Sequence, residues 1–201
     1  MSFASLHKLV AYLISALGLV ALSLGGELSV LSLAVIALGW VLSFFAEGER
    51  IARPAWSRAW TAGILAFLAL QILRGVLDGP ILALAMEFTA FLQISRLMNR
   101  RGARDYQQIA VLAFLHLIAA TVLSTELTYA LIFLGFVIVT PWMLALSHLR
   151  REIEGNYPGA SPTEGRAVAD VRRVLASRRV VGPRFLVGTA ALALPIFVLT
   201  A

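Results

Sequence analysis

Seven long apolar stretches separated by short polar breaks run through this sequence of 201 residues. A bilayer core is about 30 Å thick, and a helix needs roughly 20 residues to cross it. The stretches are continuously apolar instead of alternating, which favours helices over the strands of a membrane barrel. The sequence therefore predicts an all-α, polytopic helical membrane bundle of about seven transmembrane helices. The stretches cover residues 6–25, 28–46, 60–77, 80–98, 107–124, 128–148 and 185–201.

Composition supports this fold class and excludes several kinds of site. The chain is 60% hydrophobic and 14% charged, whereas soluble domains are about 45–50% apolar and about 25% charged. It contains no cysteine, so disulfides, thiolate nucleophiles and cysteine-ligated metals are excluded. The net charge of +6 falls in separate clusters between apolar stretches, not on one solvated surface. We therefore expect no nucleic-acid partner.

The basic residues predict how the bundle is oriented. Sixteen of the 17 Lys and Arg residues lie at the N-terminus and in the second, fourth and sixth loops, which all fall on one side. The loops on the opposite side contain a single basic residue, Arg74. Because cytoplasmic loops carry an excess of Lys and Arg, we predict a cytoplasmic N-terminus and an extracytoplasmic C-terminus. We expect these basic loops to face an anionic inner leaflet, in particular Arg100, Arg101, Arg104, Arg172, Arg173, Arg178 and Arg179.

The chain is expected to divide into three parts. Residues 1–148 form a six-helix membrane domain, residues 149–184 a basic cytoplasmic loop, and residues 185–201 a seventh helix that leads outward. Within the loop, Ser161 and Glu164 form a capping-box pattern that predicts an amphipathic helix. This helix is expected on the cytoplasmic leaflet. A solvated helix packed on the bundle ends and a partner-docking helix remain alternatives. We also expect that a longer parent protein would place its next domain outside the cytoplasm.

Among the polar side chains of the predicted spans, five are candidates for a site, because polar groups inside lipid are costly and need partners. Arg74 and Glu87 flank a tight hairpin at levels that differ by about 5 Å, which predicts an ion pair. This pair either locks the fold or provides a buried carboxylate that relays protons or binds a ligand. His116 is expected as a hydrogen-bonding core residue. The five candidates are Gln71, Arg74, Glu87, Gln93 and His116.

No motif for a metal, a cofactor or a nucleophile accompanies these residues. No two histidines share helical spacing, so we expect no metal site. The sequence contains neither a phosphate-binding loop nor a G-x-S-x-G nucleophile elbow. We therefore expect no cofactor and no catalytic residue in this chain.

The stretch 91–139 resembles the N-terminal membrane domain of TgpA-type transglutaminase-like proteins. In that family an apolar helix ends in a basic segment, and a further apolar helix closes with a short polar turn before another long one. The corresponding turn here is Ser124-Thr125, and the long helix that follows it is 128–148. The resemblance extends over roughly residues 60–201. The basic segment consists of Arg96, Arg100, Arg101, Arg104 and Asp105.

This resemblance implies a membrane anchor in the bacterial cytoplasmic (inner) membrane. In the family, an extracytoplasmic transglutaminase-like domain with a cysteine nucleophile follows the membrane region. This chain has no cysteine, so no catalytic residue is carried over. The implied role is to position that extracytoplasmic domain and to bind membrane or cytoplasmic partners. Two alternatives stay open: a stand-alone small transporter or channel, and a membrane enzyme in which Arg74, Glu87 and His116 converge.

Overall fold

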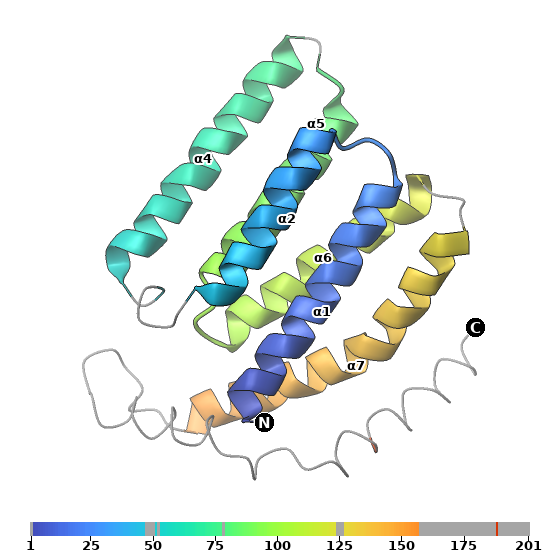
Figure 1. Ribbon diagram of the computed structural model, residues 1–201. Helices are drawn as coiled ribbons and strands as arrows, with labels where there is room; N and C mark the ends of the chain where they lie inside the picture. Colours follow the sequence, from blue (N-terminus) through green and yellow to red (C-terminus); the bar gives the residue numbers. More distant parts are fainter. Residues whose placement is uncertain are drawn as a thin grey trace.

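The computed structural model describes residues 2–46, 51, 53–77, 79–123, 127–156 and 188. This part of the chain is helical and contains no strand, which confirms the predicted all-helical class. Five of its helices are long and apolar enough to cross a membrane, whereas α2, with 16 residues, is shorter. The helices are α1 (Phe3–Leu24), α2 (Val30–Phe45), α4 (Pro54–Val76), α5 (Ile81–Met98), α6 (Ala103–Leu123) and α7 (Leu127–Asn156) (Figure 1).

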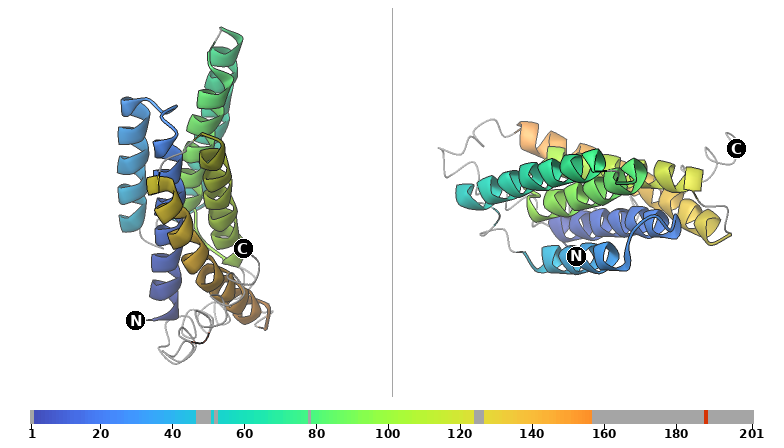
Figure 2. Two further views of the ribbon diagram at one scale, coloured as in Figure 1. Left: turned by 90° about the vertical axis from the view of Figure 1, so that its right-hand side faces the viewer. Right: turned by 90° about the horizontal axis from the view of Figure 1, so that it is seen from above.

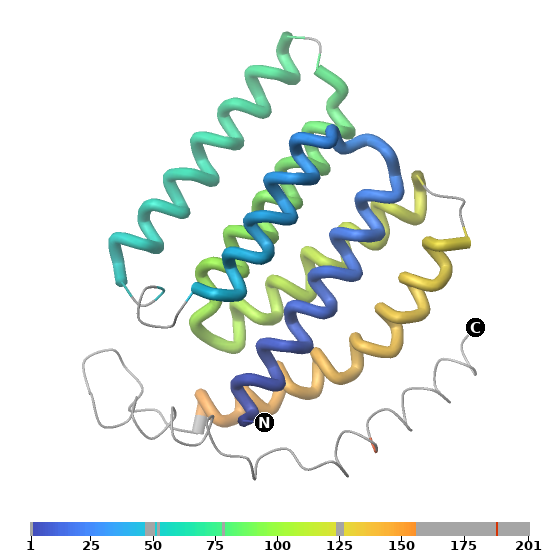
Figure 3. Tube along the Cα trace, in the orientation of Figure 1, coloured from blue at the N-terminus to red at the C-terminus, as the bar shows by residue number. Residues whose placement is uncertain are grey.

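Successive helices run in alternating directions, so the connections gather at two ends of the bundle (Figure 3). The start of α1, the end of α2, the start of α4, the α5–α6 turn and the end of α7 lie together; we call this the basic end. Of the Lys and Arg residues that the structure describes, only Arg74 lies at the opposite end. Those at the basic end are Lys8, Arg53, Arg58, Arg96, Arg100, Arg101, Arg104, Arg150 and Arg151.

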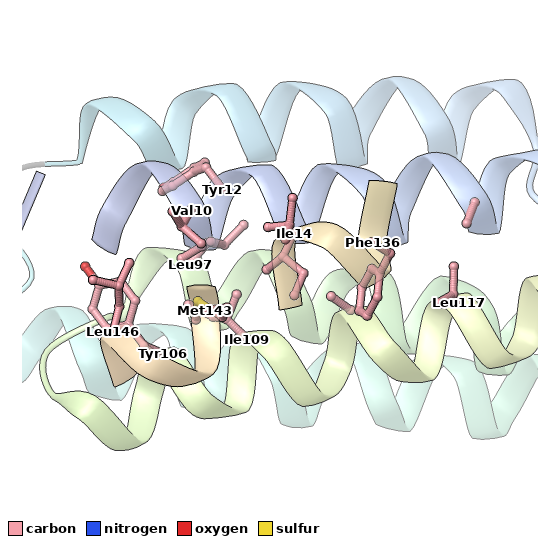
Figure 4. Close-up of a cluster of buried hydrophobic side chains, with 14 of the residues drawn as sticks. Val10, Tyr12, Ile14, Leu97, Tyr106, Ile109, Leu117, Phe136, Met143 and Leu146 are labelled. Carbon is pink, nitrogen blue, oxygen red and sulfur yellow. The ribbon is translucent and has the colours of Figure 1, made fainter. Parts of the chain in front are cut away.

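The core forms where α1 packs against α6 and α7, and α5 completes it from the side of α6. Figure 4 shows side chains from these helices meeting, among them Ile14, Ile109 and Met143. In contrast, α2 and α4 lie on the outside of the bundle (Figure 2). Ser43 is the only buried residue of α2, and Gln71 the only one of α4. Both outer helices therefore present apolar side chains away from the protein core.

Helices α1 and α6 approach so closely at Gly18 that only glycine fits. A Cβ atom at this position would lie 2.7 Å from the carbonyl oxygen of Ala113 and 2.9 Å from its Cα. Small residues allow such backbone contact between membrane helices, where dispersion and not the hydrophobic effect drives association. The contact fixes the spacing of the two helices that carry most of the core.

Helix α7 continues to Asn156, eight residues beyond the apolar stretch that ends at 148. An ion pair four residues apart, Arg150 Nε to Glu154 Oε1 at 2.8 Å, supports this extension. Pro141 lies inside the helix, and the helix curves visibly (Figure 3), as expected where proline removes a backbone hydrogen bond. The predicted amphipathic helix in 149–184 and, apart from one residue, the seventh helix lie outside the described residues.

Replacing Gly18 by alanine should destabilise the bundle, because the new methyl group must push α1 and α6 apart. We expect the free energy of unfolding to fall by about 1–3 kcal/mol, the usual cost of overpacking. Gly63→Ala on α4 is the matched control, since nothing lies within 4 Å of its added Cβ. Thermal unfolding of both variants in detergent measures the difference. Equal melting temperatures would contradict the close contact.

Candidate functional site

The guanidinium of Arg100 lies inside the basic end, where it joins three helices. Its side chain turns inward and the residue is 9% exposed. Nη1 donates to the carbonyl oxygen of Ser43 at 2.9 Å, to Tyr12 Oη at 2.9 Å and to the carbonyl of Leu97. Nη2 donates to the carbonyl oxygen of Ala46 at 3.0 Å. One side chain thereby connects α1 with the C-terminal ends of α2 and α5.

The Arg100 guanidinium donates hydrogen bonds to backbone carbonyls that the ends of α2 and α5 leave unpaired. The last four carbonyls of a helix have no intrahelical partner, and they carry a partial negative charge. Tyr12 extends the network, since its hydroxyl donates to Ser43 Oγ at 2.7 Å, and Ser43 Oγ donates to the carbonyl of Trp40 at 2.7 Å. Arg100 is therefore a shared C-terminal cap with a buried hydrogen-bond chain behind it.

A second cation reinforces the end of α2. Lys8 Nζ donates to the carbonyl oxygen of Phe44 at 2.7 Å and lies 4.1 Å from the centre of the Phe44 ring. The ring of Tyr12 packs edge-on against the Phe44 ring, with 5.1 Å between the centroids. The carbonyls that end α2 thus face two cations of the basic end.

The expectation that Arg100 faces lipid headgroups is wrong, because its guanidinium is buried among carbonyls. Arg101 and Arg104 are exposed. Arg101 also reaches back to the carbonyls of Ile51 and Arg53. The other four predicted surface arginines, Arg172, Arg173, Arg178 and Arg179, lie outside the described residues.

Two carboxylates at the basic end accept hydrogen bonds from the unpaired backbone N–H groups at the start of α6. Asp105 Oδ2 accepts a hydrogen bond from the backbone N–H of Gly102 at 2.9 Å, as the acidic residue of a capping box does. Glu154 Oε2, from the end of α7, accepts the N–H of Ala103 at 2.9 Å. Glu154 also pairs with Arg150. The extension of α7 therefore caps α6, and the two helices are tied at the basic end.

A buried histidine completes the basic end. His7 is fully buried, and its Nε2 lies 3.1 Å from Ser147 Oγ. Its ring stacks on Tyr106 with 4.1 Å between the centroids, and the guanidinium carbon of Arg150 lies 4.6 Å from the same Tyr106 ring. This stack joins α1, α6 and α7.

The opposite end contains a second polar cluster, centred on Glu87. Arg74 Nη1 lies 2.6 Å from Glu87 Oε2, so the ion pair predicted from the hairpin is present. Gln71 Nε2 donates to the same oxygen at 3.0 Å, and Ser32 Oγ donates to Oε1 at 2.6 Å. The Glu87 cluster, defined as Ser32, Gln71, Arg74 and Glu87, therefore joins α2, α4 and α5.

The remaining predicted residues, Gln93 and His116, do not join this cluster. Gln93 Nε2 donates to the carbonyl oxygen of Ile109 on α6 at 3.2 Å. His116 is 1% exposed and lies two helical turns from Ile109 on the same face of α6. The hydrogen bonds of Glu87 lead instead to α2 and α4. The structure therefore brings Arg74 and Glu87 together but does not bring His116 to them.

A protein-family model described as the TgpA N-terminal domain matches residues 12–201. The chain belongs to the TgpA N-terminal domain family. This confirms the resemblance noted in residues 91–139 and extends it to α1 and α2. Neither the curated proteins nor the solved structures contain a significant match. Among the described residues of this TgpA N-terminal domain, no group of three His, Cys, Asp or Glu side chains could hold a metal ion.

The network around Arg100 in this TgpA N-terminal domain was missed by sequence reasoning. A signal for it exists, since Tyr12 and Ser43 are polar residues near the arginine-rich side of two predicted spans. The sequence does not show which of the four arginines between residues 96 and 104 turns inward. That choice depends on where the end of α2 lies in space.

Arg100→Gln should destabilise the bundle strongly, whereas Arg104→Gln should not. The first substitution leaves several buried carbonyls without a donor, which should lower the free energy of unfolding by about 2–4 kcal/mol. The second removes a solvent-exposed charge, with an expected effect below about 0.5 kcal/mol. Denaturant unfolding in detergent compares them. An equally small effect of both substitutions would mean that Arg100, like Arg104, is a surface charge.

Proposed function

We propose that this TgpA N-terminal domain is a non-catalytic membrane anchor whose basic end faces the cytoplasm of a bacterial inner membrane. The observation that supports this orientation is the distribution of charge in the folded chain. The described Lys and Arg residues gather at the basic end, apart from Arg74, and Arg74 is paired with Glu87. By the positive-inside rule, such an end belongs on the cytoplasmic side.

The basic end has two groups of cations with different tasks. Arg100 and Arg150 are engaged in hydrogen bonds within the protein. Arg58, Arg104 and Arg151 are exposed and are available to anionic lipid headgroups, which attract basic segments by about 1 kcal/mol per residue near the surface. The buried group stabilises the bundle, and the exposed group fixes its orientation.

The anchor is proposed to position an extracytoplasmic transglutaminase-like domain, as the family resemblance implies. Two features suit such a role: the hydrogen bonds that join the helix ends at the basic end and the close α1–α6 contact at Gly18. Both limit relative motion of the helices. The exposed basic residues would also provide the contact surface for cytoplasmic or membrane partners.

Cysteine labelling tests the proposed orientation without background, because the chain has no cysteine. Glu152→Cys places a thiol at an exposed position of the basic end, and Leu127→Cys places one at a position 80% exposed at the opposite end. In intact cells, a membrane-impermeant maleimide should label the Leu127 variant only. After permeabilisation it should label both.

Reaction of the Glu152 variant from outside intact cells, with protection of the Leu127 variant, would reverse the orientation and overturn the proposal. Labelling of both variants in intact cells would show that the cells leak. A cytoplasmic protein with a native thiol, monitored in the same sample, identifies that case before the result is interpreted.

A further inference from the structure

A groove between the two outer helices joins a charged end to an apolar floor. Helices α2 and α4 pack mainly on α5, and the space between them has a volume of about 460 Å³. Ser29, Ser32, Arg74 and Glu87 line its polar part. Its apolar part is lined by Leu31, Val35, Ile36, Phe67, Leu70 and Phe91.

Arg74 has hydrogen-bonding capacity left over at the mouth of this groove. Only Nη1 of its guanidinium bonds to other described residues, namely to Gln71 Oε1 at 2.8 Å and to Glu87 at 2.6 Å. A guanidinium has five N–H donors, and the Arg74 side chain is 46% exposed. The remaining donors suit an anion with two oxygens, such as a phosphate, which arginine binds in a bidentate manner.

Glu87 holds this guanidinium in place instead of offering a site of its own. Its two oxygens already accept three hydrogen bonds, from Ser32, Gln71 and Arg74. Its side chain is only 11% exposed. The carboxylate therefore positions Arg74 at the groove, and the exposed part of the cluster is cationic.

The depth of these residues matches the two parts of a phospholipid. Arg74 lies in the last turn of α4, at the level expected for a lipid phosphate. Leu70 and Phe67 lie about 6 Å and about 10 Å further along the helix axis, toward the middle of the bundle. The ring of Phe67 packs against Phe91 with 4.6 Å between the centroids, so the groove floor is apolar at the depth of an acyl chain.

We propose that this groove binds one phospholipid, with its phosphate on Arg74 and an acyl chain along Val35, Leu70 and Phe91. Charge complementarity distinguishes it from two other hollows of similar size. The groove between α1 and α2, of about 450 Å³, has Ser23 as its one polar side chain apart from the indole of Trp40. The hollow of about 480 Å³ beside α6 and α7 has only neutral polar groups. Neither contains a charged side chain.

Native mass spectrometry of the full chain in mild detergent tests the proposal with dioleoyl phosphatidylethanolamine as the probe. The wild type should retain one lipid preferentially. The double variant Arg74→Gln/Glu87→Gln replaces the ion pair with two neutral side chains and should weaken lipid binding about tenfold or more. Arg58→Gln removes an exposed arginine from the other end of α4 and should bind as the wild type does.

A groove-filling substitution keeps the test valid if the double variant folds poorly. Leu70→Trp places an indole in the groove and leaves the Arg74–Glu87 pair intact, so it should also weaken binding about tenfold. Leu65→Trp, at a position of α4 that is 61% exposed and not part of the groove lining, is its control. Wild-type affinity in Leu70→Trp would overturn the proposal.

Two further probes separate a lipid from its parts. Dioleoylglycerol lacks the phosphate, and glycerol 3-phosphate lacks the acyl chains, so each should bind at least tenfold more weakly than the phospholipid. Equal binding of either one would overturn the proposal, since the site would then recognise only a chain or only a phosphate. The measurement is made in detergent, and its result is independent of the orientation proposed above.

Discussion

The buried guanidinium of Arg100 is the interaction on which the basic end depends. A buried charge is costly unless it is paired and hydrogen-bonded, yet neither ion pair in the described part of the chain involves Arg100. Its charge is met instead by carbonyl dipoles at the ends of α2 and α5. These ends carry partial negative charge, so the cation and the helix ends stabilise each other.

Separate contacts hold the outer helix α4 on the bundle. Its contacts with the rest of the bundle are made mainly through α5. At the basic end, Trp56 Nε1 donates to the carbonyl oxygen of Met98 at 3.0 Å, and at the opposite end Arg74 pairs with Glu87. Between them, Phe67 packs against Phe91. Helix α4 is thus fixed at both ends, which preserves the groove beside α2.

The sequence predicted the six helices of the described residues, because long apolar stretches and turn residues act locally. It also predicted the Arg74–Glu87 pair, since a tight hairpin determines which residues face each other. Gln71 and Ser32 complete that cluster from α4 and α2. The contribution of Ser32 could not be predicted, because α2 and α5 are separated by α4 in the sequence and their register depends on packing.

The inward turn of Arg100 illustrates the same limit. The four arginines between residues 96 and 104 look alike in the sequence, and counting charges treats them equally. Only the position of the α2 carbonyls gives Arg100 a buried partner set, while Arg104 stays exposed. The contact of Glu154 with the start of α6 shows the same limit, because no local pattern reveals a contact between helices.

A double-mutant cycle between Arg100→Gln and Tyr12→Phe tests this account most directly. The phenol of Tyr12 accepts a hydrogen bond from Arg100 and donates one to Ser43, so the two residues should act as one unit. We expect a coupling free energy of about 1–2 kcal/mol in denaturant unfolding, within the range for residues that share a network. Strict additivity of the two substitutions would show that Arg100 does not lie in the buried network described above.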